Sequence, residues 1–398
     1  MILSHVSLTQ FRNIQTAEID FSDGVNVLWG DNAQGKSNIL EAIYYCARGR
    51  SFRGAAEKQM IQTGAEFASF GVTYKGEQDA YPENLRFSFL AGGRKLMERD
   101  GIRTSSLMEM VGRLHAILFT PQHLSIVSGS PAERRAFMDV AIAMCYPPYI
   151  PALAAYKRTL EQRNALLRDT AAGGGSPDTD LFGVYTRALA DTGAVIASIR
   201  ADFVRRLGIL AAQQMTAISH GRDALSLRYG SSGAETAPEE VPMTRRAFGT
   251  EVPDAGYADT LYRRLMEDLR RDVLLKTTMH GPHRDDIEIE LSGMPARGFA
   301  SQGQTRSIAL SLKLAEGSLS HVLLGKKPVY LLDDVLSELD EQRRGYLLRE
   351  LSEEQLIITS CEPDLRVRNT DISFTAHRVF RGAVKTLDEE DFAPFVCR

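Results

Sequence analysis

Alternating apolar and polar positions near the start of the chain predict β-strands. The segment 1–30 contains the alternating stretch Glu18–Phe21 and the largely apolar run Val25–Trp29, which meets a glycine. Alternation is typical of a strand with one buried face, whereas a short apolar run is typical of a strand buried on both faces. The apolar positions after Lys36 have helical spacing, and residues 67–119 again predict strands joined by glycine-containing turns.

In the middle of the chain, the apolar residues have the spacing of helices. Residues 131–168 and 181–219 are rich in Ala, Leu, Arg and Gln and predict two long helices. The segment 171–177, which is rich in Ala and Gly, predicts a flexible link between them. A stretch rich in Gly, Pro, Glu and Thr over 230–256 predicts a loop, and helix is expected again over 257–276.

Strand character returns from residue 285 onward. A helix is predicted over 304–323, and the apolar run Val329–Leu332 predicts another buried strand. An α/β unit is therefore split by a helical insertion, without a heptad run long enough for an extended coiled coil. The three expected parts are a first lobe at 1–128, the insertion at 129–280 and a second lobe at 281–398.

The composition favours a globular protein of several domains. The 398 residues carry a net charge of −4, with 43% apolar and 25% charged residues, which is ordinary for a globular protein of several domains. Nucleic acid would therefore have to bind at a local basic patch. The four cysteines lack metal-binding or disulfide spacing, and the sequence shows no signal peptide and no membrane-spanning apolar run. We expect a cytoplasmic protein that does not contact a membrane.

The strongest motif follows the strand Val25–Trp29 and opens the next helix. It fits GxxxxGK[ST], the phosphate-binding loop or Walker A motif, and consists of Gly30, Asp31, Asn32, Ala33, Gln34, Gly35, Lys36 and Ser37. Glycines let backbone N–H groups approach phosphate oxygens, which a helix N-terminus also attracts. We predict that ATP binds here, with Lys36 on the β- and γ-phosphates and Ser37 on Mg²⁺. A chance glycine loop is the weaker alternative, because the required strand and helix flank the motif.

Two acids end the strand Val329–Leu332. Asp333 is placed to hold Mg²⁺ through water, as a Walker B acid does, and Asp334 is placed to orient the attacking water. Lys36 and Asp334 are thus the predicted catalytic residues. Strands that end in surface acids are common, so this motif alone is weak evidence for an ATPase. It becomes strong evidence because a phosphate-binding loop precedes it in the sequence.

A third motif precedes the helix at 304–323 and consists of Ser301, Gln302, Gly303 and Gln304. It resembles the signature of ABC ATPases, where a serine and glycine amides at a helix N-terminus form an anion site. In that resemblance the signature faces the γ-phosphate held by a second subunit, which implies an ATP-dependent homodimer. The alternative is a simple helix cap at Ser301.

Three further segments bear on the class. Ser337–Asp340 resembles the D-loop of the same superfamily, although Ser337 is equally suited to cap the next helix. The residues Thr359–Cys361 follow a predicted strand where ABC transporters carry a switch histidine, and here no histidine occurs. Gln122 is a candidate Q-loop residue, with an ordinary surface glutamine as the alternative.

Motifs spread over most of the chain resemble the RecF family of ABC/SMC-like ATPases. The segments Gly129–Pro131, Arg134–Arg135 and Phe137–Asp139 add to the likeness, whereas Gln122 and His123 depart from it, since two acids are expected there. The matching motifs are Phe11–Asn13, Gly30–Asn38, Gly49–Arg53, Gly281–Asp286, Ser301–Gln304 and Leu332–Val335.

The resemblance implies a function as well as a fold. The fold would be an ABC-type P-loop ATPase head split by a helical arm. The protein would act in recombinational repair, replication-fork maintenance and the SOS response, within the RecFOR pathway. It would bind single-stranded and gapped duplex DNA as an ATP-driven dimer, contact a RecR-like partner and assist recombinase loading. ATP hydrolysis would be slow and stimulated by DNA, in a protein that is primarily a DNA-binding switch.

Two clusters of polar residues have competing interpretations. Arg48, Arg50, Arg53 and Lys58 lie among aromatic residues and could contact DNA phosphates, or they could form a solvated surface. His280 and His283, with Asp285 and Asp286 nearby, could suggest a metal site, but a loop that joins the arm to the second lobe is preferred.

Three other protein classes share some of these motifs. An ABC transporter ATPase subunit would have a short helical lobe, which the long insertion argues against. A self-contained P-loop enzyme, such as a small-molecule kinase, would need no signature, which Ser301–Gln304 argues against. An SMC-like structural protein would need long heptad arms.

Overall fold

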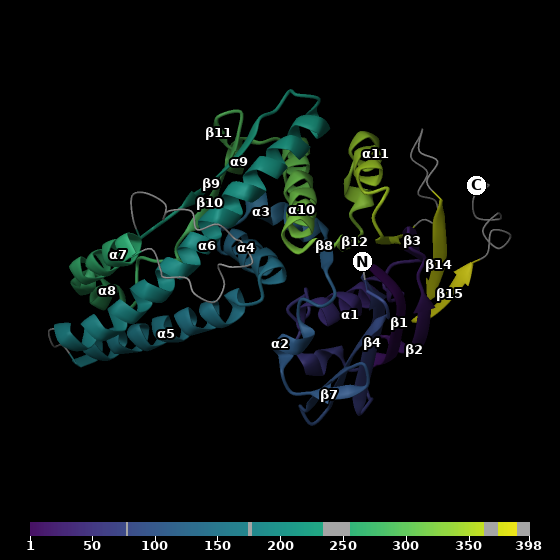
Figure 1. Cartoon of the computed structure of the whole chain (residues 1–398), viewed down its shortest axis with the longest axis horizontal. Helices are drawn as coiled ribbons and strands as arrows, with labels where there is room; N and C mark the ends of the chain where they lie inside the picture. The colour runs from purple at the N-terminus through teal and green to yellow at the C-terminus, as the bar shows by residue number, and fades with distance from the viewer. Residues whose placement is uncertain (77–78, 174–176, 234–254, 362–372, 388–398) are drawn as a thin grey trace. The chain divides into compact units, whose positions relative to one another are not determined.

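The computed structural model describes residues 1–76, 79–173, 177–233, 255–361 and 373–387. The chain divides into two units, Met1–His123 with Ser320–Arg398 (unit 1) and Leu124–Leu319 (unit 2). Figure 1 shows the elements of both. The predicted division into two lobes and an insertion, at residues 128 and 280, stays a prediction.

A mostly parallel sheet in unit 1 has the order β15-β14-β3-β13-β12-β8 (Figure 1). Its inner strand β3, Val25–Trp29, is buried along its whole length, which explains why its sequence does not alternate. Only the β14–β15 pair is antiparallel. The other strands are β8 (Ala116–Phe119), β12 (Val329–Asp333), β13 (Leu356–Ser360), β14 (Phe374–Phe380) and β15 (Ala383–Leu387).

An antiparallel sheet in unit 1 has the order β2-β1-β4-β5-β6-β7. Helix α1, Lys36–Arg48, contacts strands of both sheets, and its Tyr45 packs edge-on against Phe70, Phe87 and Phe89. The strands confirm those predicted over 1–30 and 67–119. They are β1 (Ile2–Phe11), β2 (Ile14–Asp20), β4 (Phe67–Lys75), β5 (Glu83–Leu90), β6 (Lys95–Arg99) and β7 (Ile102–Thr104), with the short helices η1 (Glu57–Met60) and α2 (Leu107–Met110).

Long helices dominate unit 2. Helix α6 contacts α4, α5 and α7, so its buried residues form the centre of this unit. The single helix predicted over 131–168 is wrong, because Pro147 and Pro148 lack the N–H groups that would continue it. The helix predicted over 257–276 is likewise divided at Asp268. The helices are α4 (Pro131–Cys145), α5 (Tyr149–Gly173), α6 (Thr179–Ser219), α7 (Ala255–Glu267) and α8 (Leu269–Leu275).

A small antiparallel sheet, β11-β10-β9, packs with these helices through β9 and β10. Of the predicted link 171–177, helix α5 takes in the first residues, and 174–176 lie outside the described residues. Most of the predicted loop 230–256 also lies outside them. The strands are β9 (Leu225–Gly230), β10 (Asp286–Leu291) and β11 (Met294–Pro295).

The remaining helices include α10, Gln302–Leu324, which confirms the helix predicted over 304–323. Among the described residues, no helix is both long and apolar enough to span a membrane. The shorter helices are η2 (Pro121–Leu124), α3 (Ser125–Ser128), α9 (Ala296–Phe299), η3 (Leu336–Glu338) and α11 (Glu341–Glu350).

Candidate functional site

The predicted phosphate-binding loop lies between β3 and α1 in unit 1. Gly30 has φ 151° and Gly35 has φ 118°, values that L side chains rarely adopt. A Cβ atom at Gly30 would lie 2.3 Å from the carbonyl oxygen of Val379 on β14. Only glycine therefore fits at this end of the loop, where the backbone of a neighbouring strand passes close by.

Polar residues from both ends of the chain hold the loop in place. The side-chain amide of Asn13 donates to the carbonyl of Ala33 at 3.2 Å. On the other side, the turn between β14 and β15 donates two backbone N–H groups to Gln34, from Arg381 at 2.6 Å and from Gly382 at 2.9 Å. This second support is not predictable from sequence, because the turn residues carry no motif.

The ammonium group of Lys36 is folded onto the loop. Its Nζ donates to the carbonyl oxygens of Gly30 and of Asp31, the latter at 2.8 Å, and lies 3.8 Å from the Sγ atom of Cys361. The side chain is buried, so these oxygen contacts compensate for much of its lost hydration. The cation thus lies among the backbone groups of the loop, where a terminal phosphate would also lie.

The two predicted acids stand at the end of β12. Strand β13 lies between β12 and β3, and its Thr359 pairs with Asp333 on one side and with Leu28 on the other. The Thr359 hydroxyl lies 3.0 Å from Oδ1 of Asp333 and accepts the backbone N–H of Asp334 at 2.9 Å. Sheet register therefore brings both acids to the same edge as the phosphate-binding loop.

Asp334 has an unusual backbone conformation. Its φ of 54° lies in the left-handed region, which is uncommon for a residue other than glycine. Ser337 donates its hydroxyl to the carbonyl oxygen of Asp334 at 2.8 Å, and its Oγ lies 3.0 Å from the Asp334 carboxylate. The Asp334 side chain is exposed, which leaves its carboxylate able to contact water.

The residues after β13 also meet the loop. The thiol of Cys361 donates to Oδ1 of Asn32 at 3.1 Å, and the carbonyl of Ser360 accepts the N–H of Gly30 at 3.3 Å. In ABC transporters this segment carries the switch histidine, which this chain lacks. Thr359 and Cys361 occupy that position with a hydroxyl and a thiol.

The signature-like residues lie in unit 2, at the start of α10. Ser301 and Gln304 exchange hydrogen bonds, with the Ser301 N–H donating to Oε1 of Gln304 and the Gln304 N–H donating to the Ser301 hydroxyl. This is a capping box, so the helix-cap interpretation of Ser301 is confirmed. Gln304 also donates to Asp223 at 3.0 Å, while Ser301 and Gln302 remain exposed.

The D-loop-like segment is capped by a different residue from the one predicted. Asp340, not Ser337, caps α11 and accepts the N–H of Arg343 at 2.9 Å. Ser337 lies within η3 and turns back onto Asp334. Gln122 lies in η2 with its side chain exposed, and its Q-loop role stays a prediction.

Comparison with known proteins decides the family. Residues 2–373 match the family described as RecF/RecN/SMC N terminal domain. A DNA replication and repair protein RecF from Symbiobacterium thermophilum is 36% identical over 394 residues, which cover 98% of this chain and 99% of that protein. A RecF from Agathobacter rectalis is 35% identical over 390 residues, 98% of this chain and 100% of that one. The chain belongs to the RecF family.

Solved structures agree with this assignment. A RecF described as a recombination mediator protein with ATP in the RecFOR pathway superposes with a TM-score of 0.84 at 30% identity, covering 97% of this chain and 98% of that one. An SMC head with an extended coiled coil reaches a TM-score of 0.55 at 17% identity and shares the fold alone. The expected α/β ATPase-head fold of the RecF family is therefore confirmed.

The RecF-like segment Gly49–Arg53 braces α1. The buried carboxylate of Glu41 accepts hydrogen bonds from the guanidinium of Arg12 at 2.7 and 3.0 Å and from the hydroxyl of Ser51. Arg53 donates to Asn38 at 2.7 Å. Arg48, one of the candidate DNA-contacting residues, is buried, whereas Arg50 and Arg53 are exposed, and contact of this cluster with DNA stays a prediction.

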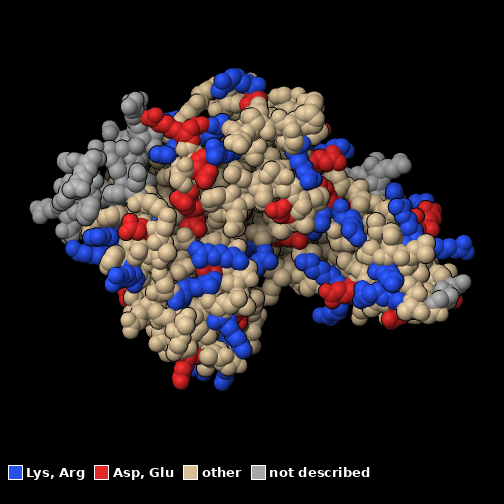
Figure 2. Space-filling model, turned by 180° about the vertical axis from the view of Figure 1, so that it is seen from behind, with Lys and Arg blue, Asp and Glu red and all other residues tan. Residues whose placement is uncertain are grey.

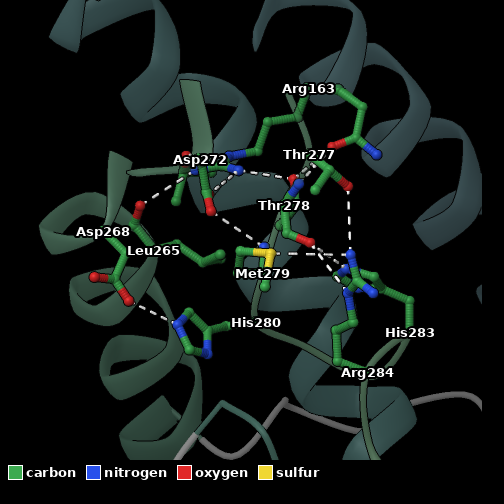
Figure 3. A network of polar contacts seen from close by, with 12 residues as sticks. Arg163, Leu265, Asp268, Asp272, Thr277, Thr278, Met279, His280, His283 and Arg284 are labelled. Carbon is green, nitrogen blue, oxygen red and sulfur yellow. Dashed lines mark hydrogen bonds and ion pairs between the residues drawn. The ribbon is translucent and has the colours of Figure 1, made fainter. Parts of the chain in front are cut away.

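The RecF-like segment Gly281–Asp286 is part of a polar network in unit 2, shown in part in Figure 3. His280 contacts Asp268 at 2.7 Å and the carbonyl of Ser232 at 2.8 Å. His283 contacts the hydroxyl of Tyr156 at 2.7 Å and the carbonyl of Thr278 at 2.9 Å. Burial lowers the pKa of His283 to about 4, so the ring is neutral near pH 7. Both histidines therefore use both ring nitrogens in contacts with protein.

Proposed function

We propose that this chain is an ATP-binding DNA-repair protein that acts as a switch between monomer and dimer. Membership of the RecF family, together with relatives named for DNA replication and repair and a RecF solved with ATP, supports this function. The observation that carries it is the position of Lys36, whose ammonium lies on the carbonyls of Gly30 and Asp31 in the phosphate-binding loop.

The residues of unit 1 fit a nucleotide with its divalent cation. The loop leaves no room for a side chain at Gly30, as a backbone cradle for phosphate requires. The Ser37 hydroxyl and the Asp333 carboxylate are oxygen ligands of the kind Mg²⁺ prefers, and Mg²⁺ would neutralise phosphate charge there. Lys36 would exchange its carbonyl contacts for phosphate oxygens, and Asp334 would orient the attacking water.

The second half of the site would come from another copy of the chain. Ser301, Gln302 and Gly303 open helix α10, whose N-terminal N–H groups form an anion-binding end. Gln304 would fix that end through its contacts with Ser301 and Asp223. The γ-phosphate bound in one subunit would thereby hold the signature of the second, which makes the homodimer depend on ATP.

The partners follow from the family. DNA, as single strands or gapped duplex, would bind the ATP-loaded dimer, and a RecR-like protein would join it in the RecFOR pathway. Assistance in loading recombinase would be its role in recombinational repair. Hydrolysis would be slow and would release the DNA, in the cytoplasm.

Nucleotide titration of the wild type and of Lys36→Ala tests the proposal. We expect the wild type to bind ATP and the variant to lose tight binding while keeping its fold, since no other amine contacts the loop among the described residues. DNA should raise the ATP turnover of the wild type. Equal ATP affinities of the two proteins, or an ATP turnover rate that is the same with and without DNA, would contradict the proposal.

A further inference from the structure

The segment Gly281–Asp286 contains an exposed arginine, Arg284, for which no salt bridge is formed within the described residues. Three arginines near it each pair with a carboxylate at 2.7 Å: Arg134 with Asp286, Arg163 with Asp272, and Arg200 with Asp139. Such pairs are satisfied within the protein. Arg135 and Arg284 lie near the same segment but have different contacts.

Arg135 and Arg284 bind only weakly basic partners. Nη1 of Arg135 donates to the backbone carbonyl of Asp285 at 2.9 Å. The guanidinium of Arg284 makes long contacts with the carbonyl of Thr278 at 3.4 Å and with the hydroxyl of Thr277 at 3.5 Å. Within the part of the chain that the structure describes, neither arginine forms a salt bridge with a carboxylate. Most of their N–H donors therefore remain for an external acceptor.

The fold places these two guanidinium groups together. Arg135 from α4 reaches the backbone of residue 285, directly after Arg284. Figure 3 shows Arg284 beside His283 and Thr278, and the ring of His283 contacts the same Thr278 carbonyl as Arg284. Burial lowers the pKa of Arg135, and the nearby guanidinium groups of Arg200 and Arg284 lower it further, while Asp286 and Asp285 oppose this shift. Arg135 and Arg284 are therefore close enough to repel each other, and an anion bound to both would relieve that repulsion.

The carboxylate nearest in sequence is held elsewhere. Asp285 is buried and accepts hydrogen bonds from the Tyr229 hydroxyl and from the N–H and hydroxyl of Ser232, at 2.5, 2.7 and 2.8 Å. Its oxygens are thereby committed to neutral donors in the core of unit 2. Arg284 is exposed, and its other neighbour in the sequence, His283, is neutral near pH 7.

We propose that Arg135 and Arg284 form a clamp for a phosphate of the DNA backbone. Planar guanidinium groups match two phosphate oxygens at once, and a backbone carbonyl holds the Arg135 group in position. The contact would position DNA without reading its bases. This inference rests on the proposed function, since it requires that the chain binds DNA.

The charge of the whole protein is consistent with a local contact. The face shown in Figure 2 carries Lys and Arg in small groups interspersed with Asp and Glu. The net charge of the whole chain is −4. Attraction of DNA must therefore come from defined pairs of cations rather than from a uniformly basic face.

The test is salt-dependent binding of a labelled gapped duplex to the ATP-loaded protein. Arg284→Ala and the double variant Arg135→Gln/Arg284→Ala should bind more weakly whatever the DNA sequence. The slope of log affinity against log salt should fall by about 0.9 for each phosphate that the protein no longer neutralises. Arg187→Ala is the matched control, because Arg187 is also in unit 2 and partly exposed but already pairs with Asp191 and Asp259. It should keep the wild-type slope.

Each other outcome has a defined meaning. If the wild type binds no DNA with ATP, the proposed function fails and the clamp with it. If the wild type binds DNA and both clamp variants keep its slope, the clamp alone is overturned. Reduced binding of polyglutamate with unchanged DNA binding would assign the pair to an acidic protein surface instead. Loss of ATP affinity in Arg284→Ala would point to a nucleotide phosphate as the true ligand, against the proposal.

Discussion

The hydroxyl of Thr359 lies 3.0 Å from the carboxylate of Asp333, and the same oxygen accepts the backbone N–H of Asp334 at 2.9 Å. One buried side chain on β13 thus links both acids at the end of β12. Because β13 also pairs with β3, the strand that leads into the phosphate-binding loop, Thr359 ties the acids to that loop. It is a positioning residue, since it acts through the two acids.

Removing this hydroxyl should impair use of the divalent cation. Thr359→Val keeps the shape of the side chain but leaves the Asp333 carboxylate without its donor, and a hydrogen bond to a charged group contributes about 1.5–3 kcal/mol. We expect the Mg²⁺ concentration for half-maximal turnover to rise about tenfold or more. Thr359→Ser should restore it. A Mg²⁺ titration and nucleotide binding measured with and without Mg²⁺ check this, and equal Mg²⁺ dependence in wild type and Thr359→Val would refute it.

The water-orienting role of Asp334 can be separated from nucleotide binding. Asp334→Asn keeps the side-chain size and the Asp333 ligand but removes the negative charge, so ATP should still bind. Turnover should fall by about 10²-fold or more, the usual contribution of a general base. The variant should accumulate as an ATP-bound dimer, which size measurement during turnover can follow. Turnover at the wild-type rate would mean that Asp334 has no such role.

The shared-site arrangement predicts a different effect for Ser301. Ser301→Arg should leave ATP binding by the monomer nearly unchanged, because Lys36 and Ser37 are untouched. It should abolish ATP-dependent dimerisation and turnover, because a bulky side chain now enters the contact with the γ-phosphate of the other subunit. Sedimentation of the wild type and the variant, each with and without ATP, measures this.

Mixing provides the control for that experiment. Ser301→Arg and Lys36→Ala proteins together should regain at most one composite site in each heterodimer, whereas each alone should have none. If the wild-type mass does not change with ATP, or if Ser301→Arg still dimerises, a self-contained P-loop enzyme becomes the better explanation.

Acid should destabilise the fold through buried histidines. Burial lowers the pKa of His115, His283 and His377 to about 4, and unfolding returns each to about 6.5. Between these values the unfolded chain binds more protons than the folded chain. The free energy of unfolding should therefore fall as pH is lowered from about 6.5 toward about 4. Urea unfolding at several pH values between about 7.5 and about 5 measures the slope.

Two variants show whether the histidines cause that slope. His377→Gln should make it shallower, since one buried neutral imidazole is removed. His5→Gln should make it steeper: although burial lowers the pKa of His5, hydrogen bonds to Asp20 and Glu18 outweigh it and raise the pKa, so its contribution is present at low pH and is lost as pH rises. A slope that neither variant changes would assign the effect to other groups.

Sequence patterns predict those features that depend on local order. The buried strand β3, helix α1 and the acids after β12 follow from apolar runs and from residue types that phosphate chemistry requires. Strand β9 is not predicted. Its alternation of apolar and polar residues is short and lies beside a predicted loop, and its partner strand β10 is distant in the sequence. The break between α4 and α5 contradicts the predicted helix, although Pro147 and Pro148 signal it directly.

Contacts between distant segments are beyond the reach of sequence. Thr359 lies where ABC transporters carry a switch histidine, but its contact with both acids appears only when β13 is placed between β12 and β3. The burial of Arg48 is equally hidden, since its neighbours in sequence, Arg50 and Arg53, are exposed. The charge of a residue does not show whether its side chain is exposed or buried, because that depends on which distant segments pack around it.

The close passage of Val379 over Gly30 has a consequence for biosynthesis. Residues 30–37 leave the ribosome long before residues 379–382, whose backbone groups lie against Gly30 and Gln34. A nascent chain that lacks β14 and its turn cannot complete the support of the phosphate-binding loop. Nucleotide capture would then begin only after synthesis of this late hairpin, so an incomplete chain would be kept from binding ATP and joining a finished subunit.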